Sequence, residues 1–426
     1  MIKKVAHTFL IKVLTALINL VVAILISQWL GAGGKGQQSL FVATFSITTL
    51  IGGLFGILPL SYLIPRKPTI NYFIIGHLWS ILASFIVFFI LKNTSIVQND
   101  FIYYITILTY LSSAAEVNLS IYLVREKIFI YNISFFLQPA SLISLLLFFY
   151  KSADTFTIYS FIYAYFISFF ILFIVSLSGA RKYIKEIKNF NISTLILDAL
   201  SMLRYGFFNQ TSHIFQMVAT RGSFYILEKF SSIENVGIYS NAVAIVESIR
   251  IINRSLALIF FSRVINSEDS VYNNALFKKF SLLSFWLQVA GLVILLIIPN
   301  EVYTFLFGKD FSSLKSVIVM LIPGMLFYGQ YIITNHYFSG VGKHHINMFS
   351  NILNMAIVLI LSYIFIPKYS LLGAAIATNI AYLSLFLFQY YFISKKFKIS
   401  ITSQVYDKKI FTEYISKLKL YINRNN

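Results

Sequence analysis

The sequence contains no cysteine, which excludes disulfides and thiolate metal sites. Charged residues are scarce as well, at 12% of 426 residues, whereas soluble globular chains carry about 25%. No Ser/His/Asp set, carboxylate pair or cluster of metal ligands stands out. These absences leave no room for a sizeable soluble domain, and they give no sign of an enzyme, a cofactor or a metal site.

What the chain has instead is a series of apolar runs, in a composition that is 58% hydrophobic. The pattern predicts an all-α polytopic membrane protein. The first run is longer than the core of a cleavable signal peptide, so we interpret it as the first spanning helix. Twelve transmembrane helices are predicted, at 6–30, 38–64, 71–91, 101–124, 129–150, 156–178, 200–227, 236–262, 280–299, 314–339, 345–366 and 371–394.

The net charge of +19 is spread unevenly about these spans. Twenty-two Lys and Arg residues fall on the side that carries both termini, and seven fall on the other side. The positive-inside rule therefore places both termini in the cytoplasm. Because most of this charge lies in short loops, it indicates membrane topology and no nucleic-acid partner.

A basic loop at 179–199 divides the spans into two halves. We predict an N-terminal six-helix lobe at 1–178, this cytoplasmic linker, and a C-terminal six-helix lobe at 200–395. The basic cytoplasmic tail at 396–426 either lies on the anionic inner leaflet or frays.

A weak internal repeat supports the division into halves. GKGQQSLFVAT opens the second span and NVGIYSNAVAI opens the eighth. The alignment pairs Gly36 with Gly237 and Ser39 with Ser240. Paired halves with a binding site between them are a recurrent plan of transporters.

Charges in the middle of the eighth span indicate a binding site. A charged side chain at the bilayer centre costs about 2.5–3.5 kcal/mol on insertion scales, so it faces protein or water. Glu247, Arg250 and Arg254 share one helix face, at spacings i, i+3 and i+7. We predict that Arg250 and Arg254 line a wet cavity and bind an anion. Glu247 is either a coupling residue or the internal partner of Arg250.

Four more charged residues lie well inside spans. Arg204, Arg221 and Lys12 are further candidates for the anion site, although each could instead snorkel to the nearer interface. Glu116 is a second candidate coupling residue.

A polar stripe follows one face of the seventh span. Asn209, His213, Gln216 and Thr220 are spaced i, i+4, i+7 and i+11. A helix surrounded by lipid would not keep such a face, so the stripe points into the bundle. It either binds the hydroxyls of a sugar or makes hydrogen bonds between helices. His213 is interpreted as an interior histidine rather than a metal ligand.

Several short motifs give the chain a family resemblance. They are WLGAGGKGQQSLF after the first span, ENVGIYSNAVAI before the eighth, FLFGKDF at 305–311, SGVGKHH at 339–345 and IPKYSLLGAAIAT at 366–378. In this order and spacing, the sequence resembles the Wzx-type polysaccharide flippases of the multidrug/oligosaccharidyl-lipid/polysaccharide exporter superfamily.

The resemblance implies two pseudo-symmetric six-helix lobes around a central cavity. It implies a flippase that moves an undecaprenyl-pyrophosphate-linked oligosaccharide, such as an O-antigen unit of lipopolysaccharide, outward by alternating access across the bacterial plasma (inner) membrane. A cationic cavity would bind the pyrophosphate. The implied partners are the lipid-linked oligosaccharide, membrane lipids, and polysaccharide polymerase and chain-length proteins.

Two other classes stay open. A multidrug or cation antiporter of the same fold is disfavoured by a cationic lumen. A membrane polysaccharide polymerase or ligase would need a catalytic carboxylate or a large outer loop, and the outer loops here are short.

The topology can be tested with single cysteines, since the native chain has none. In Lys343→Cys, an impermeant thiol reagent added outside the cell should leave the protein unlabelled, because this loop is predicted to be cytoplasmic. In Lys92→Cys and Lys309→Cys, the same reagent should label the protein. Labelling of Lys343→Cys in intact cells would contradict the twelve-span topology.

Overall fold

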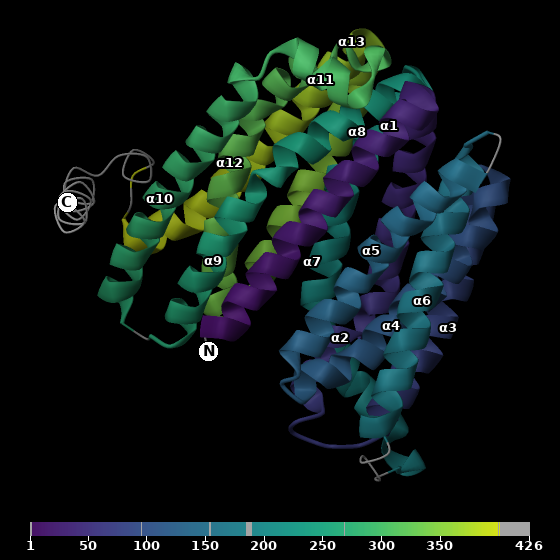
Figure 1. Ribbon diagram of the computed structural model, residues 1–426. Helices are drawn as coiled ribbons and strands as arrows, with labels where there is room; N and C mark the ends of the chain where they lie inside the picture. The colour runs from purple at the N-terminus through teal and green to yellow at the C-terminus, as the bar shows by residue number, and fades with distance from the viewer. Residues whose placement is uncertain are drawn as a thin grey trace, which may run out of the picture. The chain divides into compact units, whose positions relative to one another are not determined.

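The computed structural model describes residues 2–94, 96–152, 155–184, 190–267, 269–398 and 400, and every regular element in these ranges is helical (Figure 1). The first elements are α1 (Ile2–Gly52), η1 (Gly53–Phe55), α2 (Ile57–Leu63), α3 (Asn71–Thr94), α4 (Asn99–Val124), α5 (Ile128–Ser152), α6 (Ile158–Ile184) and η2 (Ile192–Thr194). They are followed by α7 (Leu195–Phe230), α8 (Ile233–Ser248), α9 (Arg250–Ile265), α10 (Ser270–Ile297), α11 (Asn300–Phe307), η3 (Lys309–Phe311), α12 (Leu314–Gly340) and α13 (His344–Phe397).

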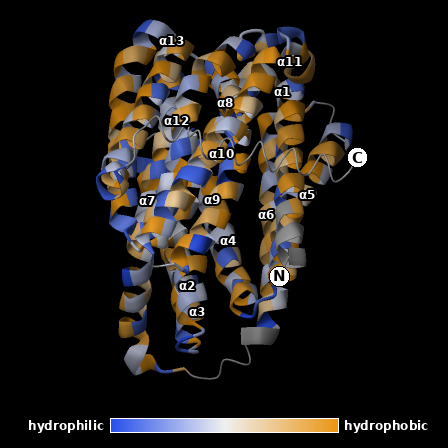
Figure 2. Cartoon of the chain, turned by 90° about the vertical axis from the view of Figure 1, so that its left-hand side faces the viewer, coloured by the Kyte–Doolittle hydropathy of each residue, from blue (hydrophilic) through white to orange (hydrophobic). Residues whose placement is uncertain are grey.

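Most of these helices suit a bilayer. Within the described ranges, 8 helical stretches are long and apolar enough to cross a membrane. Two of them, Leu10–Leu63 and His344–Phe397, have 54 residues and each contain two predicted spans. Hydrophobic residues predominate along the helices (Figure 2). The predicted all-α polytopic fold is confirmed, and the chain is a multi-pass membrane protein.

The first two predicted spans meet at a kink rather than across a loop of seven residues. Two helices join at Gly31, where φ is 65° and ψ is −170°, and residues 32–37 already belong to the second of them. This left-handed region favours glycine, which has no Cβ to clash. Residues 304–312 hold the kink in place: Ala32 N donates to Asp310 Oδ2 at 3.2 Å, and Gln28 Nε2 donates to Leu306 O at 2.9 Å.

Two other predicted spans are interrupted. The second is broken by η1 and Gly56 between α1 and α2. The eighth changes at Ile249 from α8 to α9. At Ile249 the backbone keeps right-handed helical angles, with φ −63° and ψ −24°, so the change there is a local tightening of the helix. The break at η1 and Gly56 frees backbone groups from the helical ladder, which a membrane protein tolerates where protein groups or water satisfy them.

The chain divides into two compact units, the first with residues 1–240 and 304–312, the second with 241–303 and 313–426. α7 and the start of α8 fall in the first unit, where α7 packs against α1, α2 and α3. The sequence instead divides the lobes at 179–199. That division is based on the basic loop, with the weak repeat as support, rather than on contacts, and it stays a prediction.

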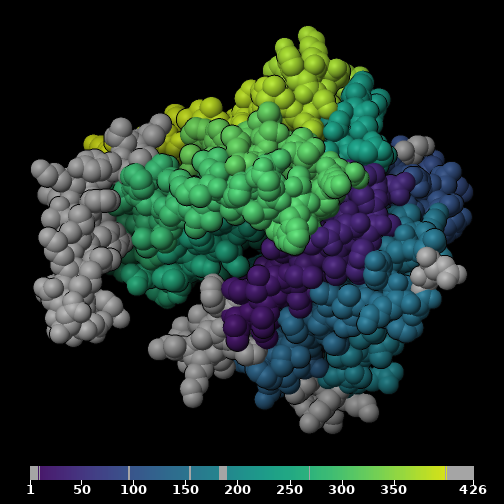
Figure 3. All heavy atoms as spheres, turned by 45° about the horizontal axis from the view of Figure 1, so that its top comes forward, coloured from purple at the N-terminus to yellow at the C-terminus, as the bar shows by residue number. Residues whose placement is uncertain are grey.

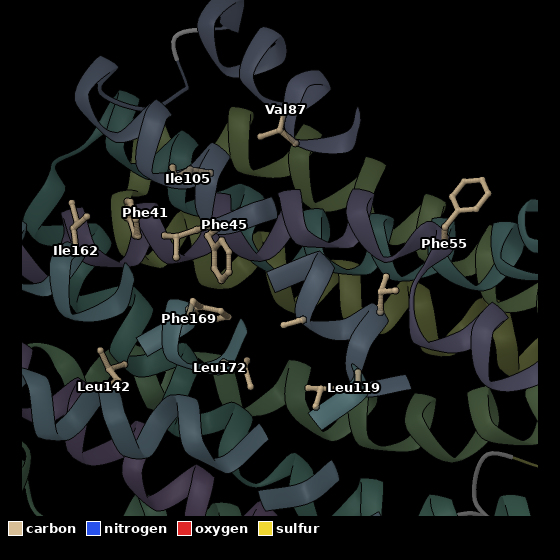
Figure 4. Packing of buried hydrophobic residues seen from close by; sticks show 14 of the residues in the cluster. Phe41, Phe45, Phe55, Val87, Ile105, Leu119, Leu142, Ile162, Phe169 and Leu172 are labelled. Carbon is tan, nitrogen blue, oxygen red and sulfur yellow. The ribbon is translucent and has the colours of Figure 1, made fainter. Parts of the chain in front are cut away.

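Aromatic side chains fill the core of the first unit (Figure 4). Phe41 and Phe45 of α1 are buried, and the ring of Phe45 lies 4.9 Å from that of Phe169 on α6. Phe41 meets the ring of Phe101 on α4 edge-on at 5.6 Å. Edge-to-face contacts of this kind fix the rotation of the helices about their axes.

α1 and α8 cross closely within the first unit, at the residues that the repeat aligns. Ser39 Oγ and Ser240 Oγ share a hydrogen bond of 2.7 Å. A Cβ atom at Gly36 would collide with the carbonyl of Ile233, and one at Gly237 would collide with the carbonyl of Ala32. Both glycines are therefore required by this approach.

A buried carboxylate closes the predicted cytoplasmic end of the first unit. Asp198 accepts hydrogen bonds from Lys67 Nζ at 2.5 Å, Asn71 Nδ2 at 2.8 Å and Thr194 Oγ1 at 3.0 Å. Burial acts to raise the pKa of Asp198, but the hydrogen bonds from Lys67, Asn71 and Thr194 outweigh it and lower the pKa below its usual value. The cluster ties the start of α7 to the segment between α2 and α3.

In the second unit, α12 packs on α9, α10 and α13. In the space-filling view, the bright green atoms of α12 lie directly against the yellow-green atoms of α13 (Figure 3). Tyr337 of α12 is buried, with its ring 5.2 Å from Phe397 of α13 and 6.4 Å from Phe260 of α9. α12 is thus the central helix of this unit.

The crossing of α1 and α8 can be tested with alanine. Gly36→Ala and Gly237→Ala should each lower the free energy of unfolding by about 1–3 kcal/mol, because the added methyl meets backbone. Gly33→Ala is the matched control, since its methyl would lie 3.4 Å from the Glu234 side chain and alanine is the better helix former. Thermal unfolding of purified protein measures all three. Equal stability of the three variants would contradict a close crossing.

Candidate functional site

The candidate site is built where the eighth span changes from α8 to α9. Glu247 lies at the end of α8, and Arg250 begins α9. Arg250 Nη1 donates to Glu247 Oε1 at 2.7 Å, so the ion pair that the i, i+3 spacing allows is present. The pair bridges the break at Ile249.

Arg250 has a second partner on another helix. Its Nη2 donates to Tyr328 Oη of α12 at 2.9 Å, and its guanidinium lies 4.2 Å from the centre of that ring. The side chain is only 8% exposed. A buried cation needs such compensation, here from a carboxylate, a phenol oxygen and a ring face.

Arg254, one turn away on α9, differs from Arg250 in its exposure and in its partners. Its side chain is exposed. Among the described residues it makes no ion pair or hydrogen bond, because the one nearby carboxylate, Glu247, is engaged by Arg250. The site therefore presents one exposed guanidinium, with a buried, neutralised one behind it.

The wall behind Arg250 is made of tyrosine and asparagine. Tyr328 packs against Tyr331 at 5.2 Å and against Tyr382 of α13 at 4.5 Å between ring centres. Tyr331 Oη donates to Asn351 Oδ1 at 3.1 Å. These contacts hold the Tyr328 hydroxyl where Arg250 needs an acceptor.

Buried amides fix the helix that carries both arginines. Asn253 of α9 donates through Nδ2 to Ser284 Oγ of α10 at 2.7 Å and to Gln288 Oε1 at 3.2 Å. Gln288 Nε2 in turn donates to Met325 O of α12 at 2.5 Å. Gly329 leaves the space for these amides, since a Cβ there would collide with Gln288. The position of Arg254 thus rests on a rigid three-helix contact.

The other predicted site residues belong to the first unit. Lys12 and Arg204 are exposed, and Arg221 lies half-buried with its guanidinium 5.5 Å from the centre of the Phe224 ring. Glu116 lies on α4, also in the first unit. Glu247, Arg250 and Arg254 are therefore the part of the predicted set that the structure brings together.

The polar stripe of α7 lies on the more accessible side of that helix. Asn209, Gln216 and Thr220 are half-buried and His213 is exposed. The neighbouring Gln210, which the periodicity missed, is buried and donates through Nε2 to Leu50 O at 2.7 Å. The hydrogen bond from Gln210 to Leu50 O shows that Gln210 is the amide of α7 that packs against α1. The spacing of polar residues in the sequence does not predict this contact.

Lys35 is one of the seven basic residues that the topology places on the outer side. It lies inside α1, and 7% of its surface is exposed. Its Nζ donates to Gln38 Oε1 at 2.5 Å. A lysine in the run GAGGKG carries no periodic signal that would predict this burial.

Comparisons with known proteins concern the whole fold. No family model matches the chain. The chain is similar to the capsular polysaccharide biosynthesis protein CapF of Staphylococcus aureus, with 23% identity over 175 residues. These residues are 40% of this chain and 44% of CapF, so the chain spans less than half of that relative.

Two solved structures are similar over nearly the full length. One is the lipid II flippase MurJ in an inward closed conformation, with a TM-score of 0.72 and 17% identity over 98% of this chain and 93% of that chain. The other is an inward-facing multidrug resistance MATE family transporter of the MOP superfamily, with a TM-score of 0.71 and 16% identity over 91% and 96%. The chain therefore has the 12-helix, two-lobe fold of MOP-superfamily transporters.

The ion pair of Arg250 with Glu247 predicts that Glu247 stabilises the fold, whereas the exposed Arg254 does not. Unfolding measurements can test this difference. Glu247→Ala should lower the free energy of unfolding by about 3–5 kcal/mol, because it leaves a buried guanidinium without its counter-charge. Arg254→Ala, the matched control on the same helix, should change it by less than about 1 kcal/mol. Thermal or denaturant unfolding of the purified variants gives both values. A stable Glu247→Ala protein would mean that Arg250 does not depend on this carboxylate.

Proposed function

We propose that the protein is a flippase for a lipid-linked oligosaccharide with a diphosphate head, moved outward across the bacterial plasma membrane. The observation that carries the proposal is Arg254, an exposed guanidinium inside a predicted span, with no ion-pair partner among the described residues. A span tolerates such a charge only in a wet, protein-lined space. An anionic ligand is the natural complement of that charge.

The chemistry of arginine suits a diphosphate. Guanidinium stays charged in a low dielectric and donates two parallel hydrogen bonds to phosphate oxygens. Arg254 is the proposed direct ligand. Arg250 supports it from behind, and its own charge becomes available to the ligand only to the extent that Glu247 releases it.

The remaining predicted residues have proposed roles along the path. Lys12, Arg204 and Arg221 would attract the diphosphate at other stages of transport. The α7 stripe would donate and accept hydrogen bonds from the sugars. The polyprenyl chain would stay in lipid, so the transporter would perform no covalent chemistry.

The similar proteins support the substrate class. One is a capsular polysaccharide biosynthesis protein and another is a lipid II flippase. The resemblance to Wzx-type flippases adds polymerase and chain-length proteins as partners, and the distribution of Lys and Arg puts both termini in the cytoplasm. An antiporter for organic cations, the runner-up, is disfavoured because an uncompensated guanidinium repels such ligands.

A flipping assay in proteoliposomes tests the proposal, with a panel of diphosphate-linked oligosaccharide lipids as substrates. Arg254→Ala should lower the rate at least about tenfold, the factor expected from losing one charge-assisted hydrogen bond of about 1.5–3 kcal/mol. Arg254→Lys should restore only part of the rate, because the planar fork is lost.

Arg263→Gln is the matched control for the flipping assay. Arg263 is also an exposed cation of α9, but it lies in the last turn. Its removal should leave the rate near that of the wild type. If Arg254→Ala flips every lipid of the panel at the wild-type rate, the anion-site proposal fails.

A further inference from the structure

A further feature of the first unit is a groove on the surface of α3 and α4, two helices that lie side by side (Figure 1). The groove has a volume of about 440 Å³, within the range of about 300–1,000 Å³ that is typical of ligand pockets. Its lining residues lie at 81–88 of α3 and at 106–110 of α4. No other described element lines the groove, so it opens to the surroundings of the unit.

The groove forms because a short side chain lies between long ones. Ser84 is buried, and its Oγ donates to Ile81 O at 2.7 Å, so this side chain folds back onto its own helix. Phe85 and Ile107, which also line the groove, are exposed. Both lie inside predicted spans, where exposed apolar side chains face lipid. A hydrocarbon chain is therefore the natural filling of this groove.

One polar atom of the groove has no partner. Thr106 Oγ1 is buried and makes no hydrogen bond with any described residue. A threonine inside a helix can satisfy its hydroxyl by donating to the carbonyl four residues earlier, as Thr109 does to Ile105 O at 2.8 Å. An unpaired hydroxyl is costly in an apolar environment. Thr106 thus points to a ligand that brings a hydrogen-bond acceptor into the groove.

A cation lies at one end of the groove. Lys92 is exposed in the last turn of α3, and its Nζ lies 5.7 Å from the centre of the Phe88 ring. The same ring meets that of Tyr103 of α4 at 5.8 Å. In the described part of the chain Lys92 makes no ion pair. Its ammonium therefore folds back over a ring that lines the groove, where it can meet an anion.

We propose that this groove binds an anionic phospholipid of the outer leaflet, with its phosphate on Lys92 and one acyl chain between α3 and α4. The phosphate complements the ammonium, and the ester carbonyl of the chain accepts a hydrogen bond from Thr106 Oγ1. The leaflet follows from the predicted topology, which places Lys92 on the outer side. The site itself follows from the groove, the hydroxyl and the cation, and it does not rest on the proposed function.

The hydroxyl favours a phospholipid over a polyprenyl lipid. A polyprenyl phosphate would also bring an anion to Lys92, but its hydrocarbon chain carries no acceptor for Thr106. A phospholipid carries ester carbonyls one glycerol away from its phosphate. Thr106 and Phe88, the ring beneath the ammonium, line the same groove, so both contacts are available to one lipid. The bound phospholipid is then a ligand distinct from the lipid that the protein is proposed to move.

Photo-crosslinking tests the site in the full-length protein. The probe is phosphatidylglycerol with a diazirine in one acyl chain, added to purified protein in detergent, and mass spectrometry locates the label. The wild type should be labelled at 81–88 and 106–110. Unlabelled phosphatidylglycerol should compete with the probe. Undecaprenyl phosphate, which has no ester, should compete about two- to tenfold less well, the factor expected from one missing hydrogen bond.

Three variants separate the contacts. Lys92→Ala should weaken competition by phosphatidylglycerol about fivefold, the factor expected for one basic residue beside an anionic lipid. Thr106→Val, which removes the hydroxyl and keeps the branched shape, should weaken it about two- to tenfold. The same variant should leave competition by undecaprenyl phosphate unchanged. Ile107→Trp fills the groove from an exposed position and should remove the label from both segments.

Lys229→Ala is the matched control for the lysine. Lys229 also lies in the last turn of its helix on the predicted outer side, with Nζ 5.3 Å from the centre of the Phe230 ring, but it does not line the groove. Its removal should leave competition by phosphatidylglycerol unchanged.

Three results would overturn the proposal. The first is a label spread over other helices, or one that Ile107→Trp does not reduce. The second is an equal loss of competition in Lys92→Ala and Lys229→Ala, which would mean a general attraction of lipid to basic residues. The third is tighter competition by undecaprenyl phosphate than by phosphatidylglycerol, which would assign the groove to a polyprenyl chain.

Discussion

The bilayer cannot solvate a charge, and the positions of the charged side chains in this protein follow from that constraint. Arg250 is neutralised within the fold, by Glu247 and by the hydroxyl and ring of Tyr328. Arg254, four residues later, is left accessible. Arg250 and Arg254 thus show two states of a cation on one helix, internal pairing and exposure.

Neutral polar side chains hold the helices that carry these charged residues in place. Asn253 and Gln288 join α9 to α10 and α12, and Gln210 holds the end of α1. In lipid, a hydrogen bond between helices is favoured because no water competes for the donor. Amides therefore add specific links between helices to the apolar and aromatic packing of the core.

The sequence predicts the helical spans well, because apolar length is a local property. It also predicts the Glu247–Arg250 pair, since i, i+3 spacing alone brings the two side chains together. It does not predict that Tyr328 completes the pair, or that Gln210 rather than its periodic neighbours packs against α1. Those contacts join residues 78 and 160 positions apart.

The kink at Gly31 has a consequence for how the chain can change length. Each residue inserted into a continuous α-helix turns everything before it by about 100°. An insertion before Gly31 would rotate only the N-terminal half of α1, because the kink already interrupts the helical register. An insertion between Gly31 and Gly36 would turn Gly36 away from Ile233 and bring a side chain into the crossing. The residues just after Gly31 are thus fixed in register by α8, whereas those before it are fixed by separate contacts, such as that of Gln28 with Leu306.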